Sequence, residues 1–176
     1  MCLVGVSARA QGLLICKNAT VSFYSSTVLE DIEAKSNTGT SAINVKTGEM
    51  LFKVSNTSFR FQKKLMQEHF NENYMESNTF PKADFKGAIT NLSTINFSKD
   101  GTYPATVKGD LTIHGVTKNV ELPGTVTVAQ GMISAHSKFS VKVKDYNIKI
   151  PATVINNIAE TIDVTVDCKY EPYKKG

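Results

Sequence analysis

Long apolar runs are missing from this 176-residue chain, which contains no stretch of the roughly 18 to 20 apolar residues that a membrane-spanning helix needs. Basic clusters are missing too, because the lysines behind the formal net charge of +4 are scattered. A nucleic-acid-binding surface needs clustered basic residues with aromatic platforms. The sequence therefore predicts no nucleic-acid partner. The mild basic charge is consistent with transient membrane contact, although solvated surface lysines are the favoured interpretation.

Catalytic and metal-binding motifs are also missing. His69, His114 and His136 lack the spacing of metal ligands, and no cysteine lies near them in the sequence. Neither a Gly-x-Ser-x-Gly nucleophile motif nor a phosphate-binding glycine loop occurs. We therefore expect no enzyme activity, no metal and no cofactor. His114 lies at a predicted turn, where its imidazole is expected to bond to backbone groups.

The amino terminus resembles the end of an export signal. Residues 1–6 are short and apolar, and Ala8-Arg9-Ala10 before Gln11 has the small-x-small spacing that a signal peptidase accepts. We interpret residues 1–10 as a signal-peptide remnant and residues 11–176 as one domain. Export to the periplasm or secretion is the expected localisation.

Cysteine is scarce, with Cys2, Cys16 and Cys168 as the three positions. Loss of Cys2 with a signal peptide would leave an even pair, which in an exported protein is a disulfide candidate. The alternative is two unrelated buried thiols that pack as small hydrophobic groups.

Alternation of apolar and polar residues is what the sequence has in abundance. Around a hairpin at Gly115, apolar or small residues occupy every second position from residue 105 to 113 and from 120 to 128. Such alternation predicts antiparallel strands with one buried face, and Gly115 readily adopts the positive φ of a tight turn. Further strands are predicted at residues 13–25, broken near Lys17-Asn18, and at 40–46, 50–54, 59–61, 83–89, 133–143 and 162–170. Pro123 is expected at a bulge or sheet edge because it cannot donate a ladder hydrogen bond.

One segment follows a helical period instead. Met66, Phe70 and Tyr74 recur every four residues between residues 62 and 77, which predicts an amphipathic helix of about four turns that ends near Asn78-Thr79 and Pro81. In a chain otherwise made of strands, such a helix most simply covers an open barrel end. Its apolar stripe could pack on the core, touch a ligand, or do both.

The predicted inner faces carry small residues among larger ones, including Ala83, Gly87, Gly109 and Ala135. Eight strands form a barrel that is either filled by side chains or wide enough for one slender ligand. The small residues fit an open tube and a tapered packed core equally well.

The turn motif Leu111-Thr112-Ile113-His114-Gly115-Val116-Thr117-Lys118 resembles the signature of the YceI-like polyisoprenoid-binding family. Looser similarity extends to residues 21–23, 66–83, and 144–148 with Pro151, and covers residues 12–172. The resemblance implies an all-β fold, an antiparallel lipocalin-like barrel of about eight strands with one amphipathic helix covering it. It also implies an exported bacterial protein that holds a long-chain isoprenoid lipid, of the isoprenoid quinone or polyprenyl phosphate type.

With that resemblance, the inward side chains predict an apolar ligand-binding cavity. The residues expected to line it are Phe23, Phe52, Phe59, Phe61, Met66, Phe70, Tyr74, Phe85, Val107, Gly109, Leu111, Ile113, Ala135 and Phe139. The alternative is a secreted barrel interaction module with a filled core and no lipid. An enzyme of unidentified activity is a more distant third reading.

Overall fold

The structure is a computed structural model that describes residues 12–173. The predicted signal-peptide remnant, residues 1–10, lies outside the described residues and stays a prediction. The strands are β1 Leu13–Ser26, β2 Asp31–Asn44, β3 Glu49–Ser55, β4 Arg60–Phe61, β5 Lys82–Ile89, β6 Gly101–Ile113, β7 Val116–Ala129, β8 Met132–Lys142 and β9 Thr161–Pro172.

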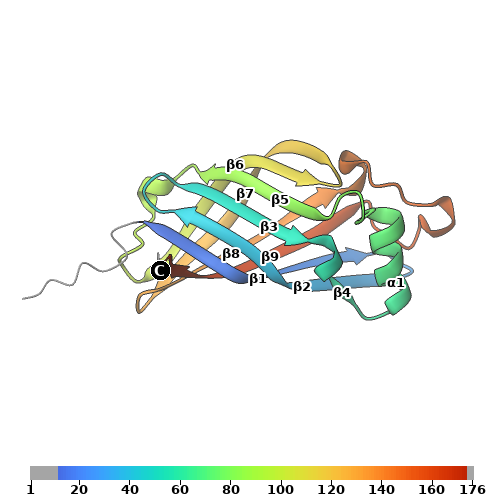
Figure 1. Ribbon diagram of the computed structural model, residues 1–176, viewed down its shortest axis with the longest axis horizontal. Coiled ribbons are helices and arrows are strands. Elements are labelled where there is room, and N and C mark those ends of the chain that lie inside the picture. The colour runs from blue at the N-terminus through green and yellow to red at the C-terminus, as the bar shows by residue number, and fades with distance from the viewer. Residues whose placement is uncertain (1–11, 174–176) are drawn as a thin grey trace, which may run out of the picture.

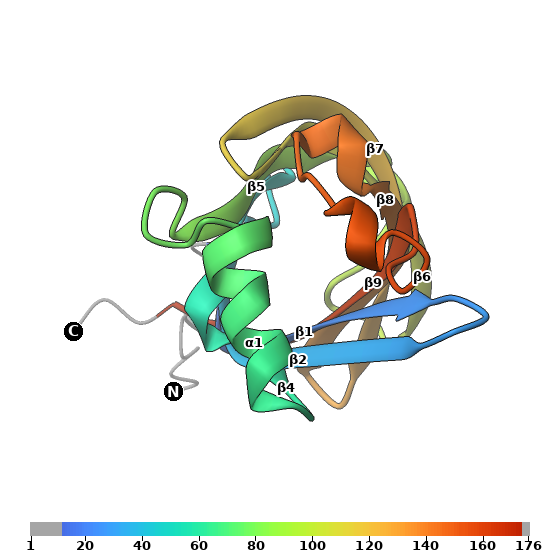
Figure 2. The ribbon, with the colours of Figure 1, turned by 90° about the vertical axis from the view of Figure 1, so that its right-hand side faces the viewer.

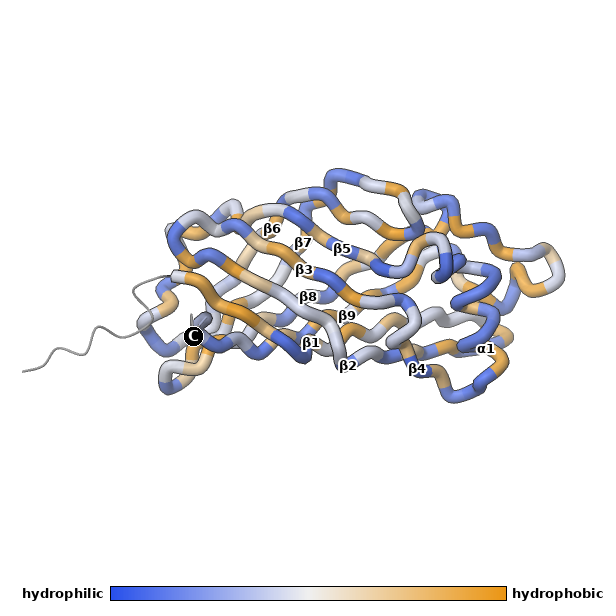
Figure 3. The backbone as a smooth tube through the Cα atoms, viewed as in Figure 1, coloured by the Kyte–Doolittle hydropathy of each residue, from blue (hydrophilic) through white to orange (hydrophobic). Residues whose placement is uncertain are grey.

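These strands form one closed antiparallel barrel (Figures 1 and 2). The sheet order is β1-β9-β8-β7-β6-β5-β3-β2, and β1 also pairs with β2, which completes the ring. The two-residue strand β4 adds to the edge of β2. Hydrophobic and hydrophilic residues alternate along the strands (Figure 3), as one buried face per strand requires. The predicted all-β barrel of about eight strands is confirmed.

The β6–β7 hairpin and its turn at Gly115 are present as predicted. Ile113 pairs with Val116, and the two residues between them both have positive φ, 52° at His114 and 72° at Gly115. A two-residue turn with this geometry matches the right-handed twist of the flanking strands. A Cβ at residue 115 would also collide with the ring of Phe80, so glycine is required there for two reasons.

Two irregularities expected from the sequence are present as local features of long strands. The break near Lys17-Asn18 is a register shift between Cys16 and Ala19 within β1, so this strand is bent rather than divided. Pro123 lies on β7 just beyond the ladder to β8, which begins at Thr125. The Pro123 carbonyl accepts the Ser137 hydroxyl of β8, so the Pro123 nitrogen also faces β8 and the ladder to β6 loses no hydrogen bond.

The predicted helix is present but shorter than residues 62–77. The α-helix α1 spans Lys64–His69 and continues as a π-helical turn over Phe70–Tyr74. The helical segment ends at Tyr74, and the chain then turns back on it. The Ser77 N–H and hydroxyl donate to the backbone and side-chain oxygens of Asn71. Figure 2 shows the segment lying across one end of the barrel. No helix among the described residues is long and apolar enough to cross a membrane.

The barrel interior divides into a filled end and a hollow end. At the filled end, Cys16 and Cys168 are both buried in a cluster that includes Ala19, Val126 and Tyr170. Both thiols are free in the structure, so the candidate disulfide is not formed there. Burial, with a further contribution from nearby Cys16, raises the pKa of the Cys168 thiol to about 12. These cysteines pack as small hydrophobic groups.

Candidate functional site

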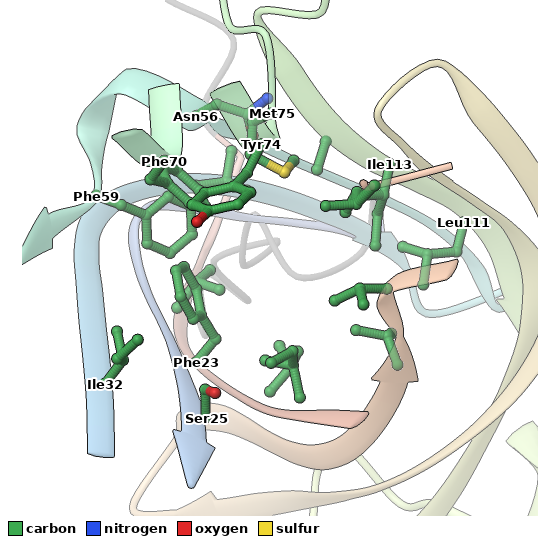
Figure 4. A pocket seen from close by; sticks show the side chains of 18 of the residues that line it. Phe23, Ser25, Ile32, Asn56, Phe59, Phe70, Tyr74, Met75, Leu111 and Ile113 are labelled. Carbon is green, nitrogen blue, oxygen red and sulfur yellow. The ribbon is translucent and has the colours of Figure 1, made fainter. Parts of the chain in front are cut away.

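The hollow end contains a cavity of about 350 Å³. It extends from α1 into the barrel, between the cluster around Val21 and Phe59 and the cluster around Phe85 and Leu111 (Figure 4). Its volume falls within the range of about 300–1,000 Å³ usual for small-molecule sites. The lining is predominantly aliphatic and aromatic.

The sequence prediction of this lining was accurate but incomplete, since other residues of β1, β2, β3 and β9 also line the cavity. Every residue predicted to line the cavity does so, except Gly109 and Ala135. Gly109 pairs with Gly87 across β5 and β6, where a Cβ at residue 109 would collide with the Lys86 carbonyl and the Gly87 Cα. The glycine thus permits a close approach of two strands instead of widening the cavity.

Ala135 belongs to the filled end of the barrel. It pairs with Val126 on one side and Cys168 on the other, and it packs against the cluster that contains both. The inward parity of residue 135 was predicted correctly, but parity does not distinguish the filled end from the hollow end.

Four phenylalanines hold the helical segment at the cavity. Phe70 stacks on Phe23 with ring centroids 5.3 Å apart, and its centroid lies 5.8 Å from that of Phe59 and 5.1 Å from that of Phe61. Figure 4 shows Phe70 and Phe59 beside Tyr74, with Phe23 facing them. The predicted stripe of Met66, Phe70 and Tyr74 lines the cavity along its whole length, so this face combines core packing with exposure to the cavity.

Few polar groups line the cavity, and its basic residue is His69, with no lysine or arginine in the lining. The Tyr74 hydroxyl has no hydrogen-bond partner within the described chain, and burial raises the pKa of this phenol above its ordinary value. The carboxylate-bearing lining residues are Glu30 and Asp84. Among the described residues, no group of three or more His, Cys, Asp or Glu side chains could hold a metal ion.

Glu30 connects the three segments that surround the cavity mouth. Its carboxylate accepts hydrogen bonds from Lys63 before α1, at 3.4 Å, and from Asn157 in the β8–β9 connection, at 3.3 Å. Glu30 itself lies in the β1–β2 turn, and the neighbouring Ser25 hydroxyl accepts the Ala159 N–H at 2.9 Å. The mouth is therefore held by a few polar contacts rather than by a strand ladder.

Sequence periodicity missed the contribution of the β8–β9 connection. Ile148, Ile150, Val154 and Ile158 from this connection line the cavity. The connection contains only short 3-10 helices, Val143–Tyr146 and Ala152–Val154, so its apolar residues follow neither period. The signal was the density of isoleucine and valine over residues 148–158.

Solved structures with a similar fold come from several bacteria. A polyisoprenoid-binding domain from Saccharophagus degradans matches with a TM-score of 0.79 and 15% identity, covering 93% of this chain and 99% of that one. Burkholderia cenocepacia BcnA matches with a TM-score of 0.72 and 18% identity, covering 87% and 96%. A Campylobacter jejuni YceI protein matches with a TM-score of 0.51 and 14% identity, covering 76% and 78%.

At these identities the structural matches show a shared fold. No protein of curated function matches this chain in sequence. The family model described as the YceI-like domain, however, matches residues 15–170, nearly the whole chain. This protein therefore belongs to the YceI-like domain family.

Proposed function

We propose that this protein binds one long-chain isoprenoid lipid with its tail inside the barrel. The observation that carries the proposal is the apolar cavity of about 350 Å³ at the hollow end of the barrel. It favours lipid binding over the alternative of an interaction module with a filled core. The similar domain from Saccharophagus degradans is described as polyisoprenoid-binding, which adds support.

Affinity in such a site comes from desolvation. Each buried methylene contributes roughly 0.8 kcal/mol, so a long tail binds tightly without specific polar contacts. The lining offers both flexible Met66 and Met75 and rigid aromatic rings, which together can accommodate a branched polyene. The protein would thus act by binding and carrying rather than by catalysis.

The polar head group is proposed to be uncharged, which favours the isoprenoid quinone type over a polyprenyl phosphate. A phosphate held in the cavity would face the carboxylates of Glu30 and Asp84, and among the lining residues His69 is the one basic side chain, because no lysine or arginine lies there. Two carboxylates beside a single imidazole disfavour a buried anion. The unpartnered Tyr74 hydroxyl could instead donate to a carbonyl or hydroxyl oxygen of the head group.

Extraction of the purified native protein with organic solvent, followed by mass spectrometry, tests this function directly. We expect co-purified isoprenoid lipid, and its head group will be read from the same spectrum. Val107→Phe should lower lipid occupancy, because Val107 lines the cavity. Lys108→Phe is the matched control on the exposed side of the same strand. Equal occupancy in both variants would contradict binding in this cavity.

The compartment is proposed to be the periplasm or the exterior of a bacterial cell. The support is the Ala8-Arg9-Ala10 spacing before Gln11. Amino-terminal sequencing of the protein from its native host should find cleavage before Gln11. An uncut cytoplasmic product would refute export.

A further inference from the structure

Half of the large hydrophobic side chains that are exposed in the described chain lie at the cavity mouth. Val28 and Leu29 at the β1–β2 turn are 102% and 62% exposed, Leu65 in α1 is 61% exposed, and Ile155 in the β8–β9 connection is 54% exposed. We call these four residues the mouth rim. Their three segments are joined through Glu30, which bonds to Lys63 and Asn157, so the four residues belong to one end of the barrel.

The mouth rim is continuous with the cavity lining. Leu65 is exposed while the next residue, Met66, lines the cavity. Ile155 is exposed while Val154 and Ile158 of the same connection line the cavity. In α1 and in the β8–β9 connection, exposed apolar residues thus lie within one to three positions of residues that line the cavity, as a path for a lipid tail would need.

The chemistry of the mouth rim suits a lipid surface. Residues 150–159 contain no charged side chain, so this connection can enter an interface without desolvating an ion. Lys63 and Lys64, both exposed, directly precede Leu65. Lysines with this placement reach the head-group level while neighbouring apolar side chains insert.

The ends of the described chain do not cover the mouth rim. Leu13 and Tyr173 are joined by a backbone hydrogen bond of 2.9 Å at the end of the barrel opposite α1 (Figure 1).

We infer that the mouth rim docks on the surface of a lipid bilayer and aligns the cavity mouth with the acyl chains. This inference rests on the proposed lipid-binding function, because a membrane is the source and destination of an isoprenoid lipid. Docking would let the tail pass between bilayer and barrel along the apolar lip without crossing water.

The chain contains no tryptophan, so a single introduced indole reports on its own surroundings. We would place one at the rim with Ile155→Trp and one at the opposite end with Met132→Trp, where the side chain is 69% exposed. The probe is a vesicle of phosphatidylethanolamine and phosphatidylglycerol with brominated acyl chains. Bromine should quench and blue-shift the emission of Ile155→Trp and leave that of Met132→Trp unchanged.

A second set of variants measures the contribution of the side chains. Combined replacement of Val28, Leu29 and Leu65 by Ser should weaken vesicle binding by about tenfold or more, because insertion depends on buried apolar area. Leu51→Ser, on the exposed side of β3, is the control and should bind as the unmodified protein does. These positions are solvent-exposed, so the fold is expected to tolerate the changes.

Either of two results would overturn docking. One is equal quenching of both indoles. The other is unchanged vesicle binding in the triple Ser variant, which would indicate that the mouth rim contacts a protein partner instead of a bilayer. The lipid extraction is independent of vesicles. Co-purified isoprenoid without rim quenching would refute docking alone, whereas rim quenching without co-purified isoprenoid would refute the proposed ligand.

Discussion

The His114 imidazole lies 2.6 Å from the carboxylate of Glu76, measured between Nε2 and Oε2, although 38 residues separate the two. Its other nitrogen, Nδ1, lies 2.9 Å from the Tyr146 carbonyl oxygen. Because a carbonyl oxygen can only accept, Nδ1 donates to it. The buried ring thereby joins the β6–β7 turn to the end of the helical segment and to the β8–β9 connection. The sequence predicted the backbone bond but not the partnership with Glu76.

His114→Ala should destabilise the protein by about 1–3 kcal/mol, because it leaves the carbonyl of buried Tyr146 without its donor. Glu76→Ala should cost less, on the order of 1 kcal/mol or below, since the Glu76 side chain is 52% exposed. Urea unfolding of both variants measures the difference. If both variants lost the same free energy of unfolding, the contact with Glu76 rather than the bond to Tyr146 would account for the stabilisation by His114.

The helical segment should act as the movable wall of the mouth. Met66 lines the cavity and takes no part in the four-phenylalanine contacts, so Met66→Ala should speed lipid release while largely retaining the melting transition. Release to acceptor vesicles, measured beside thermal unfolding, separates the two effects. Glu68→Ala, at an exposed position of α1, is the control.

Phe70→Ala should act differently from Met66→Ala. It removes the stack on Phe23, so we expect faster release together with a loss of stability toward the lower end of the roughly 3–5 kcal/mol typical of a buried phenylalanine. Loss of stability with unchanged release in the remaining native protein would mean that the segment is fixed core and that the lipid entrance lies elsewhere.

Gly109→Ala should destabilise the barrel by about 3 kcal/mol or more, because a Cβ would collide with the backbone of β5. Large residues at this position should therefore disrupt the fold instead of filling the cavity. Chemical denaturation of Gly109→Ala beside Lys108→Ala, the exposed neighbour, gives the comparison. A stable Gly109→Ala protein with native spectra would show that β5 and β6 can move apart at little cost.

Alkaline pH should weaken the fold through Cys168. Its pKa rises from an ordinary 9.0 to about 12 in the folded protein, so above pH 9 the unfolded state loses a proton that the folded state keeps. Stability is then full below pH 9 and declines as pH rises toward 12, by at most about 1.4 kcal/mol per pH unit. Denaturation between pH 9 and 10 should show this slope, and Cys168→Ala should reduce it. If stability declined equally steeply with pH in Cys168→Ala, titratable groups other than Cys168 would be the cause.

Local periodicity in the sequence determined most of the strands, the helical stripe and part of the cavity lining. A side chain points to one face at every second position of a strand, and this relation needs no knowledge of distant residues. Gly115 likewise occupies a turn whose φ is a local property. The first half of β2 was missed, because its inward Ser36 is polar and is buried against the Ser58 hydroxyl at 2.6 Å.

Tertiary structure alone decided where the barrel is hollow. Ala135 and Phe139 share one parity on β8, yet Ala135 packs on the filled end and Phe139 lines the cavity, because the positions differ in what lies across the barrel. The surroundings of Gly109 and Glu30 were also decided by tertiary structure. Gly109 faces Gly87 on the neighbouring strand, and the partners of Glu30, Lys63 and Asn157, lie far along the chain. Periodicity specifies the direction of a side chain, whereas the space in front of it depends on strands brought together only when β1 pairs with β9.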